Sequence, residues 1–213
     1  MRDFAFTSCS GLTSIAVERE NSVYDSRDNC NAIIETTTNT LITGCKNTTI
    51  LNSVTSIDNY AFYKCTDLTE VTIPNSVTLI GYGSFYDCSD LKSVIIGNSV
   101  ASIGDFAFSK CLDLRLINVL NPKPPTCYSN TFSHYESSLE VTIGSLEAYK
   151  SADVWSNFTK VTEVVGIEDI KADESDVIEA IRYDVHGRRL EQPTRGINII
   201  KMSDGSTRKE IVR

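Results

Sequence analysis

Residues that carry much of protein chemistry are scarce in this sequence of 213 residues, which has only two His and one Trp. Its seven Cys form no C-x-x-C pair, and this argues against a structural zinc site. No apolar run approaches the roughly 18 residues that a membrane-spanning helix needs. Lys and Arg number 20 against 28 Asp and Glu, so the chain lacks the clustered positive charge that binds nucleic acid. We therefore expect neither a transmembrane segment nor a nucleic-acid partner.

Catalytic and metal-binding constellations are missing as well. His134 and His186 lie far apart in the sequence, without nearby Cys, Asp or Glu at fixed spacing, so we interpret both as surface or turn residues. The acidic run 173–176 lacks the further oxygen ligands of a calcium loop and is interpreted as a solvated linker. The sequence thus predicts no catalytic residue, no metal site and no cofactor.

What the sequence does have is an internal period of 23 residues. Phe62, Phe85 and Phe108 recur at this spacing. Other apolar positions keep step with them: Val54, Val77 and Val100; Ile57, Ile80 and Ile103; Cys65, Cys88 and Cys111; Leu68, Leu91 and Leu114; Val71, Val94 and Ile117; Ile73, Ile96 and Val119. A period of this length is the signature of a solenoid, in which each unit buries its apolar stripe only against its neighbours.

The outer copies of the repeat are degenerate. A copy starting at Phe6 lacks its preceding positions, so we expect the chain to open inside a repeat, as a trimmed part of a longer protein, and see no signal peptide. A later copy starts at Phe132, with Tyr135 in the Cys position and Val141 and Ile143 in the strand positions. Between Val17 and Ile50 one repeat is ten residues longer than the others.

These patterns predict an α/β repeat fold: a solenoid with a parallel β-sheet on one face and short helical turns or loops on the other. About seven rungs are expected in residues 1–165, with a hairpin insertion projecting near 29–46 and an end cap near 145–160. In this cap Trp155 is predicted to cover the last apolar rung; the alternative is an exposed Trp that stacks on a ligand. Strands are expected near residues 15–17, 48–50, 71–73, 94–96, 117–119, 141–143 and 161–164.

The repeat unit Ala-Phe-x-x-Cys-x-x-Leu-x-x-Val-x-Ile-Pro-Asn-Ser-Val-x-x-Ile-Gly, clearest at residues 61–81, resembles the leucine-rich repeats of the Bacteroides surface protein A (BspA-like) family. The enlarged repeat from Asn29 to Thr48 is also similar to that family. The resemblance implies a leucine-rich-repeat superhelix of surface or secreted bacterial proteins, a family often associated with adhesion and host contact. It names no ligand.

Beyond about Gly166 the 23-residue pattern stops, so residues 166–213 are predicted to form a linker and a small β-rich module. Strand-like runs are expected over 177–185, 196–202 and 207–212. The run Tyr183-Asp-Val-His-Gly-Arg-Arg-Leu190 and the segments after it resemble the C-terminal sorting domains of Bacteroidetes type IX secretion. That resemblance implies export and surface attachment; the alternative is a small β appendage without a targeting function.

The repeated Cys position admits two interpretations. Cys9, Cys65, Cys88 and Cys111 share one position of the repeat, and neighbouring rungs can bring their sulfurs close enough for disulfides. An odd total of seven excludes complete pairing, and Tyr135 fills the same position in a later copy. We therefore favour free thiols that act as small buried apolar groups.

The most plausible ligand surface is the outward face of the sheet, where equivalent positions of successive rungs stack side by side. Its predicted, speculative binding residues are Thr69, Glu70, Thr72, Lys92, Ser93, Ile95, Arg115 and Asn118. The rows continue to Thr13, Ser14, Ala16 and Leu116, and a plain solvated face is the competing interpretation.

We expect a non-enzymatic cell-surface or secreted protein that binds a host or bacterial surface protein, matrix component or glycan, in the manner of an adhesin. One alternative is a structural spacer of a longer surface protein without a ligand of its own. A carbohydrate-binding protein or an enzyme is less favoured, because the sequence lacks the necessary constellations. The oligomeric state does not follow from the sequence.

Overall fold

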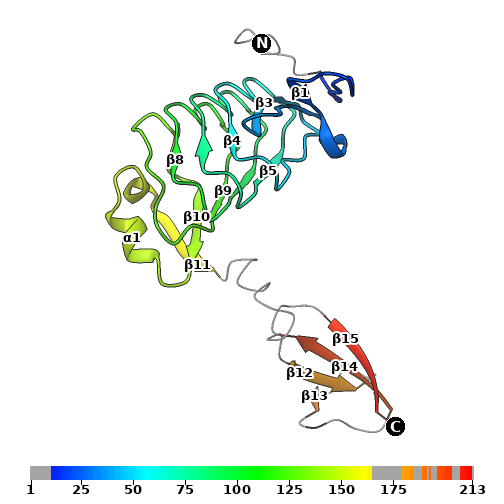
Figure 1. Cartoon of the computed structure of the whole chain (residues 1–213). Coiled ribbons are helices and arrows are strands. Elements are labelled where there is room, and N and C mark those ends of the chain that lie inside the picture. The colour runs from blue at the N-terminus through cyan, green and yellow to red at the C-terminus, as the bar shows by residue number, and fades with distance from the viewer. Residues whose placement is uncertain are drawn as a thin grey trace. The chain divides into compact units, whose positions relative to one another are not determined.

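A computed structural model of the chain describes residues 11–164 and, further on, 179–184, 189–190, 192, 196–202 and 207–212. The chain divides into two compact units, Met1–Val164 and Val165–Arg213. In the first unit the rungs follow one another in sequence order, from blue at the N-terminal end of the stack to yellow at α1 (Leu146–Ser151) (Figure 1). This unit is the predicted parallel-stranded leucine-rich-repeat solenoid.

One face of the solenoid is a parallel sheet in the order β11-β10-β9-β7-β5. Its strands are β5 (Glu70–Ile73), β7 (Ser93–Ile96), β9 (Leu116–Val119), β10 (Ser138–Thr142) and β11 (Lys160–Val164). In β7 the apolar residues Val94 and Ile96 are fully buried, whereas Ser93 and Ile95 are only half-buried. The alternation required for a strand with one buried face is therefore present in each regular rung.

The opposite side carries a second, narrower sheet in the order β1-β2-β3-β4-β6-β8. Its strands are β1 (Tyr24–Asp25), β2 (Ala32–Glu35), β3 (Thr40–Gly44), β4 (Ser56–Ile57), β6 (Leu79–Ile80) and β8 (Ser102–Ile103). The repeated Ile position thus forms two-residue strands, where the sequence suggested turns or loops. The Phe-x-x-Cys segment forms hydrogen-bonded turns, such as Cys65 N to Phe62 O at 3.0 Å, and no helix.

The enlarged repeat does contain a hairpin, but the hairpin belongs to the stack. Strands β2 and β3 pair antiparallel, and β3 then pairs in parallel with β4. Ala32, Ile34 and Leu41 are at most 1% exposed and join the core of the solenoid. The expectation of a projecting hairpin was wrong, because its apolar residues find partners on the first regular rung.

Other expected strands also differ from the structure. Residues 15–17 and 48–50 form no strand. In the copy that begins at Phe132 the strand is β10, and Leu139 and Val141 point inward, in register with Ile117 and Val119. Ile143, predicted to be a core residue, is 65% exposed. This copy has two residues fewer between its Phe and its strand, which shifts the apolar pair.

A column of stacked Phe rings runs through the core. Phe62, Phe85, Phe108 and Phe132 lie with successive ring centroids 4.9, 5.1 and 5.6 Å apart and interplanar angles of at most 8°. Beside them, the Sγ of Cys88 donates to Phe62 O and that of Cys111 to Phe85 O, both at 3.1 Å. Each rung therefore places its ring and its thiol against the preceding rung.

The C-terminal end of the solenoid is closed by aromatic side chains. Helix α1 is followed by the short 3-10 helix η2 (Trp155–Asn157), and the hairpin end carries another, η1 (Arg27–Asn29). Trp155 is fully buried, its Nε1 donates to Pro125 O at 2.7 Å, and its ring lies 5.5 Å from that of Phe132. Trp155 thus covers the last rung and ties the Pro-rich loop 121–125 to it.

The second unit is a small antiparallel sheet in the order β13-β12-β14-β15. Its strands are β12 (Glu179–Asp184), β13 (Arg189–Leu190), β14 (Gly196–Met202) and β15 (Thr207–Val212). The predicted linker 166–178 and the predicted turn 203–206 lie outside the described residues.

The Phe column generates a stability prediction. Phe85 is 0% exposed and is covered by a ring on each side. Replacing Phe85 with Ala should lower the free energy of unfolding by about 3–5 kcal/mol, because the cavity cannot close between two rigid rungs. Chemical denaturation of the wild type and the variant measures this difference. A variant as stable as the wild type would disprove the assigned position.

The Cys position generates a second prediction. All six described cysteines, from Cys30 to Cys127, are free. Burial raises the pKa of Cys65 to about 11 and that of Cys111 to about 12, so little thiolate is present near neutral pH. A thiol reagent should react slowly with the native chain and with close to seven thiols after unreduced denaturation. A count of one to three would instead reveal a disulfide ladder.

Candidate functional site

The structure gathers the predicted binding residues on the outward face of the five-stranded sheet. Glu70 pairs in register with Ser93, and Thr72 with Ile95, which in turn lies beside Asn118. The positions just before the strands are stacked by backbone bonds: the Lys92 N–H donates to Thr69 O at 2.8 Å, and the Arg115 N–H to Lys92 O at 2.9 Å. All eight predicted residues therefore lie in adjacent rows, whereas Thr13, Ser14 and Ala16 lie outside the sheet.

Two further strands extend these rows beyond the predicted residues. In β10, Ser138 and Glu140 lie beside Leu116 and Asn118, and β11 adds Lys160 and Thr162 beyond them. The 23-residue spacing missed these positions, because the repeat at Phe132 is shorter in this part. The face is mixed in charge.

The two cations among the predicted residues of this face, Lys92 and Arg115, are solvated and form at most one long ion pair. Lys92 is exposed, and within the described residues no carboxylate lies within 4.0 Å of its Nζ. The Arg115 guanidinium lies 3.8 Å from Asp113 Oδ1, with the Arg115 side chain 78% exposed. A long ion pair in water is worth little, so both charges can turn to a partner.

Asn118 is the one half-buried amide among these predicted residues. Its Nδ2 donates to Glu140 Oε2 at 3.1 Å. Its Oδ1 is buried, and no donor in the described part of the chain reaches it. A buried acceptor without a donor destabilises a fold by roughly 1–3 kcal/mol. A donor from a bound partner would remove this cost.

A groove of about 430 Å³ opens where the sheet ends at β5. The segment 48–52 does not pair with β5, because the N–H groups of Thr48 and Thr49 donate to Cys45 O and Cys30 O in the enlarged repeat. The predicted residues that line the groove are Glu70, Thr72, Ser93 and Ile95; Thr48, Thr49, Ile50, Asn52, Val71 and Pro74 complete it. Sequence analysis missed these last six, although the ten-residue enlargement marked the place where the regular stacking breaks.

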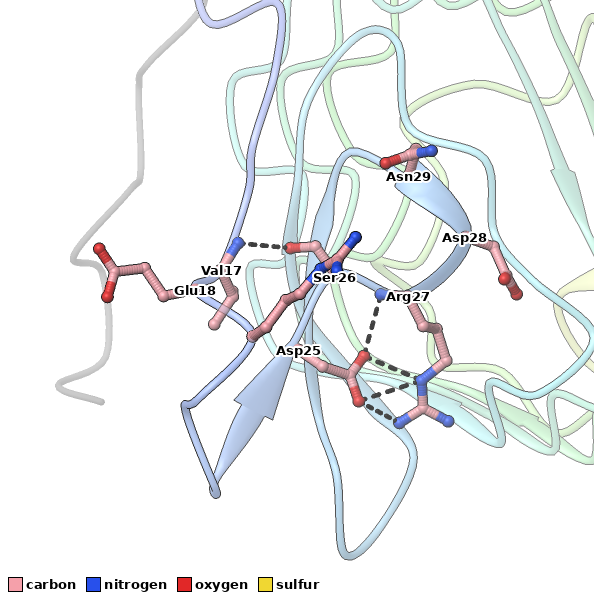
Figure 2. Close-up of a pocket in the computed structure, with 8 residues that line it drawn as sticks. Val17, Glu18, Asp25, Ser26, Arg27, Asp28 and Asn29 are labelled. Atoms are coloured by element: carbon pink, nitrogen blue, oxygen red, sulfur yellow. Dashed lines mark hydrogen bonds and ion pairs between the residues drawn. The ribbon is translucent and has the colours of Figure 1, made fainter.

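A second, polar pocket lies at the N-terminal end of the stack (Figure 2). Asp25 accepts hydrogen bonds from Arg27 Nε and Nη2, and this contact lowers the pKa of the Asp25 carboxyl. Ser26 Oγ accepts from Val17 N at 3.0 Å and donates to Ala32 O at 2.7 Å. These groups satisfy one another and hold the incoming chain on the hairpin, so we assign the pocket a structural role.

Further features of the described residues concern metal binding, the histidines and the membrane. No three His, Cys, Asp or Glu side chains of the described residues form a group that could hold a metal ion. His134 is half-buried, with its Nε2 3.1 Å from Leu114 O. His186 and the acidic run 173–176 lie outside the described residues. In the same part of the chain, no helix is both long and apolar enough to cross a bilayer.

Stacked 23-residue rungs with a parallel sheet and a stacked Phe column define a leucine-rich-repeat solenoid. The family of BspA type leucine-rich repeat regions matches residues 32–162 in six copies, and the chain belongs to this family. No curated protein sequence matches it. A leucine-rich cell surface protein from Faecalibacterium prausnitzii A2-165 has a similar structure, with a TM-score of 0.54 and 23% identity. The match covers 81% of this chain and 47% of that one, so this chain spans about half of its length.

Asn118 provides a test of the face. Replacing Asn118 with Val removes an acceptor that has no donor, at the loss of one partly buried hydrogen bond to Glu140. We expect the free energy of unfolding to stay level or rise by about 1 kcal/mol. Thermal or urea denaturation measures it, with Thr162→Val on the same row as the control. A loss above about 1 kcal/mol would mean that the amide is fully used within the fold.

Proposed function

We propose that this chain is a non-enzymatic binding segment of a surface-displayed bacterial protein, adhesin-like, that contacts a host or bacterial surface protein or matrix component through the face of the five-stranded sheet. One observation carries the proposal. This face holds polar groups that the fold does not need: two solvated cations at Lys92 and Arg115, and the unpartnered Oδ1 of Asn118. A solvated face carries charged side chains in any case, but it has no use for a buried acceptor without a donor, so Asn118 is the strongest sign of a partner.

The surface location is supported by membership in the BspA-type family and by the similar fold of a protein described as a leucine-rich cell surface protein. The small β-rich module predicted within residues 166–213 fits the same proposal. Its resemblance to type IX sorting domains, carried by Tyr183–Leu190, implies export and attachment, and a small antiparallel sheet suits such a module. The proposal includes no enzyme activity, in keeping with the repeat family to which the chain belongs.

The binding face is tested with the double variant Lys92→Thr/Arg115→Thr. Thr occupies the equivalent position at Thr69, so folding should be unchanged, as surface changes usually stay within about 0.5 kcal/mol. Binding to any matrix or surface protein captured from an array should weaken by roughly 0.4–2 kcal/mol, because each exposed charge contact contributes about 0.2–1 kcal/mol. The salt dependence of binding should also become shallower.

The matched control is Lys123→Thr/Lys150→Thr, which removes the same charge from exposed positions outside the sheet. Both variants are compared at low and at physiological salt. If the two double variants bind equally, the charge effect is general and the proposed face is wrong. A chain that shows no saturable binding on the whole array would act instead as a spacer within a longer surface protein.

A further inference from the structure

A cluster of aromatic side chains lies along the turns between the two sheets, away from the proposed binding face. It comes from three successive rungs and consists of Tyr60, Tyr63, Tyr82, Tyr86 and Phe106. The rings contact one another in a closed circuit, with centroid distances from 5.2 to 6.4 Å. Four contacts are edge-to-face and one is a parallel stack. We call this feature the aromatic cluster.

One glycine makes room for the Tyr60 ring of the aromatic cluster. Tyr60, Gly83 and Phe106 occupy the same position of the repeat, and all three have left-handed backbone conformations, with φ of 60°, 54° and 57°. A Cβ on Gly83 would lie 2.9 Å from the Tyr60 ring. The middle rung therefore has no side chain where both neighbours carry an aromatic one. A separate hollow of about 260 Å³ lies among the five side chains, which line it.

Two of the three left-handed positions carry bulky residues although glycine adopts this conformation without strain. Core packing does not explain this choice, because Tyr60 and Phe106 are only half-buried. Tyr82 is 40% exposed. The left-handed conformation recurs at Lys64, Asp87 and Lys110, so it belongs to the turns of the repeat. Rigid, partly exposed aromatic side chains give a recognition surface a large contact area at low entropic cost.

The groups around the hollow are hydrogen-bond donors. Four of the five rings are Tyr, and two ammonium groups flank them: Lys64 Nζ lies 5.5 Å from the Tyr63 ring centroid, and Lys110 Nζ 5.1 Å from that of Tyr86. A suitable ligand therefore offers acceptors together with a compact C–H surface. These lysines already provide positive charge at two ring faces, so a cationic ligand would be repelled.

The ring geometry separates the remaining ligand classes. A sugar or a base stacks on an open, flat ring face, but the neighbouring rings here stand at 62–78° to one another. The one parallel pair, Tyr63 and Tyr86, covers its own inner faces. Walls at steep angles around a small hollow suit a compact, three-dimensional group such as a pyrrolidine ring.

The spacing of the rungs agrees with this ligand. Successive rungs lie about 4.8 Å apart, so Tyr60 and Phe106 are separated by about 9.6 Å along the stack. A polyproline II helix rises about 3.1 Å per residue and repeats every three residues, after about 9.3 Å. Its backbone carbonyls have no internal partners and need donors. Proline-rich segments are bound by aromatic-lined grooves for these reasons.

We propose that the aromatic cluster is a docking site for a proline-rich segment of a partner protein in the polyproline II conformation. One pyrrolidine ring enters the hollow among the five side chains. Lys64, together with the hydrogens that remain beside the Tyr60–Tyr82 and Lys110–Tyr86 hydrogen bonds, donates to carbonyls of the segment. This site is separate from the sheet face, so the two proposals stand or fall independently.

The test uses the full chain and a fluorescein-labelled peptide of Ser-Pro-Pro repeats, about twelve residues long, followed by fluorescence anisotropy. The matched peptide has Gly in place of every Pro. We expect saturable binding of the Pro peptide and at least tenfold weaker binding of the Gly peptide. Tyr82→Ala should weaken binding at least tenfold, since this side chain is the most exposed of the five and the Tyr82 N–H keeps its bond to Asn59 Oδ1.

Tyr128→Ala is the control variant, because Tyr128 is 57% exposed and lies outside the aromatic cluster. This variant, and Lys92→Thr/Arg115→Thr, should bind the Pro peptide like the wild type. Tyr82→Phe keeps the ring if the Ala variant melts early, and it should weaken binding by the loss of one donor. Equal binding of both peptides, or an unaffected Tyr82→Ala, would overturn the proposal. The proposal would also be overturned if a glycan from an array, or choline, bound at this site while the Pro peptide did not bind.

Discussion

The structure depends on one constraint: no rung of this chain has a core of its own. The Phe85 ring is covered by Phe62 on one side and by Phe108 on the other, at 4.9 and 5.1 Å, so each unit is completed by its neighbours. This requirement keeps each repeat close to 23 residues; the copy from Phe108 to Phe132 takes one residue more and still places its ring in the column. In the regular copies it also places surface residues that are 23 positions apart side by side. Both the sheet face and the aromatic cluster result from this stacking of equivalent positions.

The Cys of the repeat donates a hydrogen bond to a backbone carbonyl inside the buried Phe column. In the turns, the carbonyl groups of Phe62 and Phe85 each accept one backbone N–H, from Cys65 and Cys88, and each can accept a second donor. The thiols of Cys88 and Cys111 fill apolar space and also donate to the carbonyl of the preceding Phe. A Val would fill the space without donating, and a Ser would donate but bury a more strongly polar group. Cysteine combines both properties at this position.

Where the period holds, the sequence was sufficient to predict the fold. Val71, Val94 and Ile117 lie in register as expected, and Trp155 covers the last rung. Errors occurred where the repeat length changes. The hydrogen bond of Thr49 N–H to Cys30 O, which prevents the strand at 48–50, arises from the enlarged repeat and leaves no mark in the apolar pattern. The aromatic cluster was not predicted because it leaves only a weak mark in the sequence: Tyr63 and Tyr86 recur at 23 residues, but the equivalents of Tyr82 are Asn59 and Asp105.

The closed ends of the stack determine how such a molecule can change its size. A bare terminal rung would be a template for the rungs of a second molecule and would lead to fibres. Here the antiparallel hairpin occupies one end, and Trp155 fills the other, while β11 carries Lys160 and Glu163 on the last strand of its sheet. An additional 23-residue copy can enter only between existing copies, where it meets the same neighbours on both sides. Gene duplication can therefore lengthen the solenoid internally while Trp155 continues to cover the same rung.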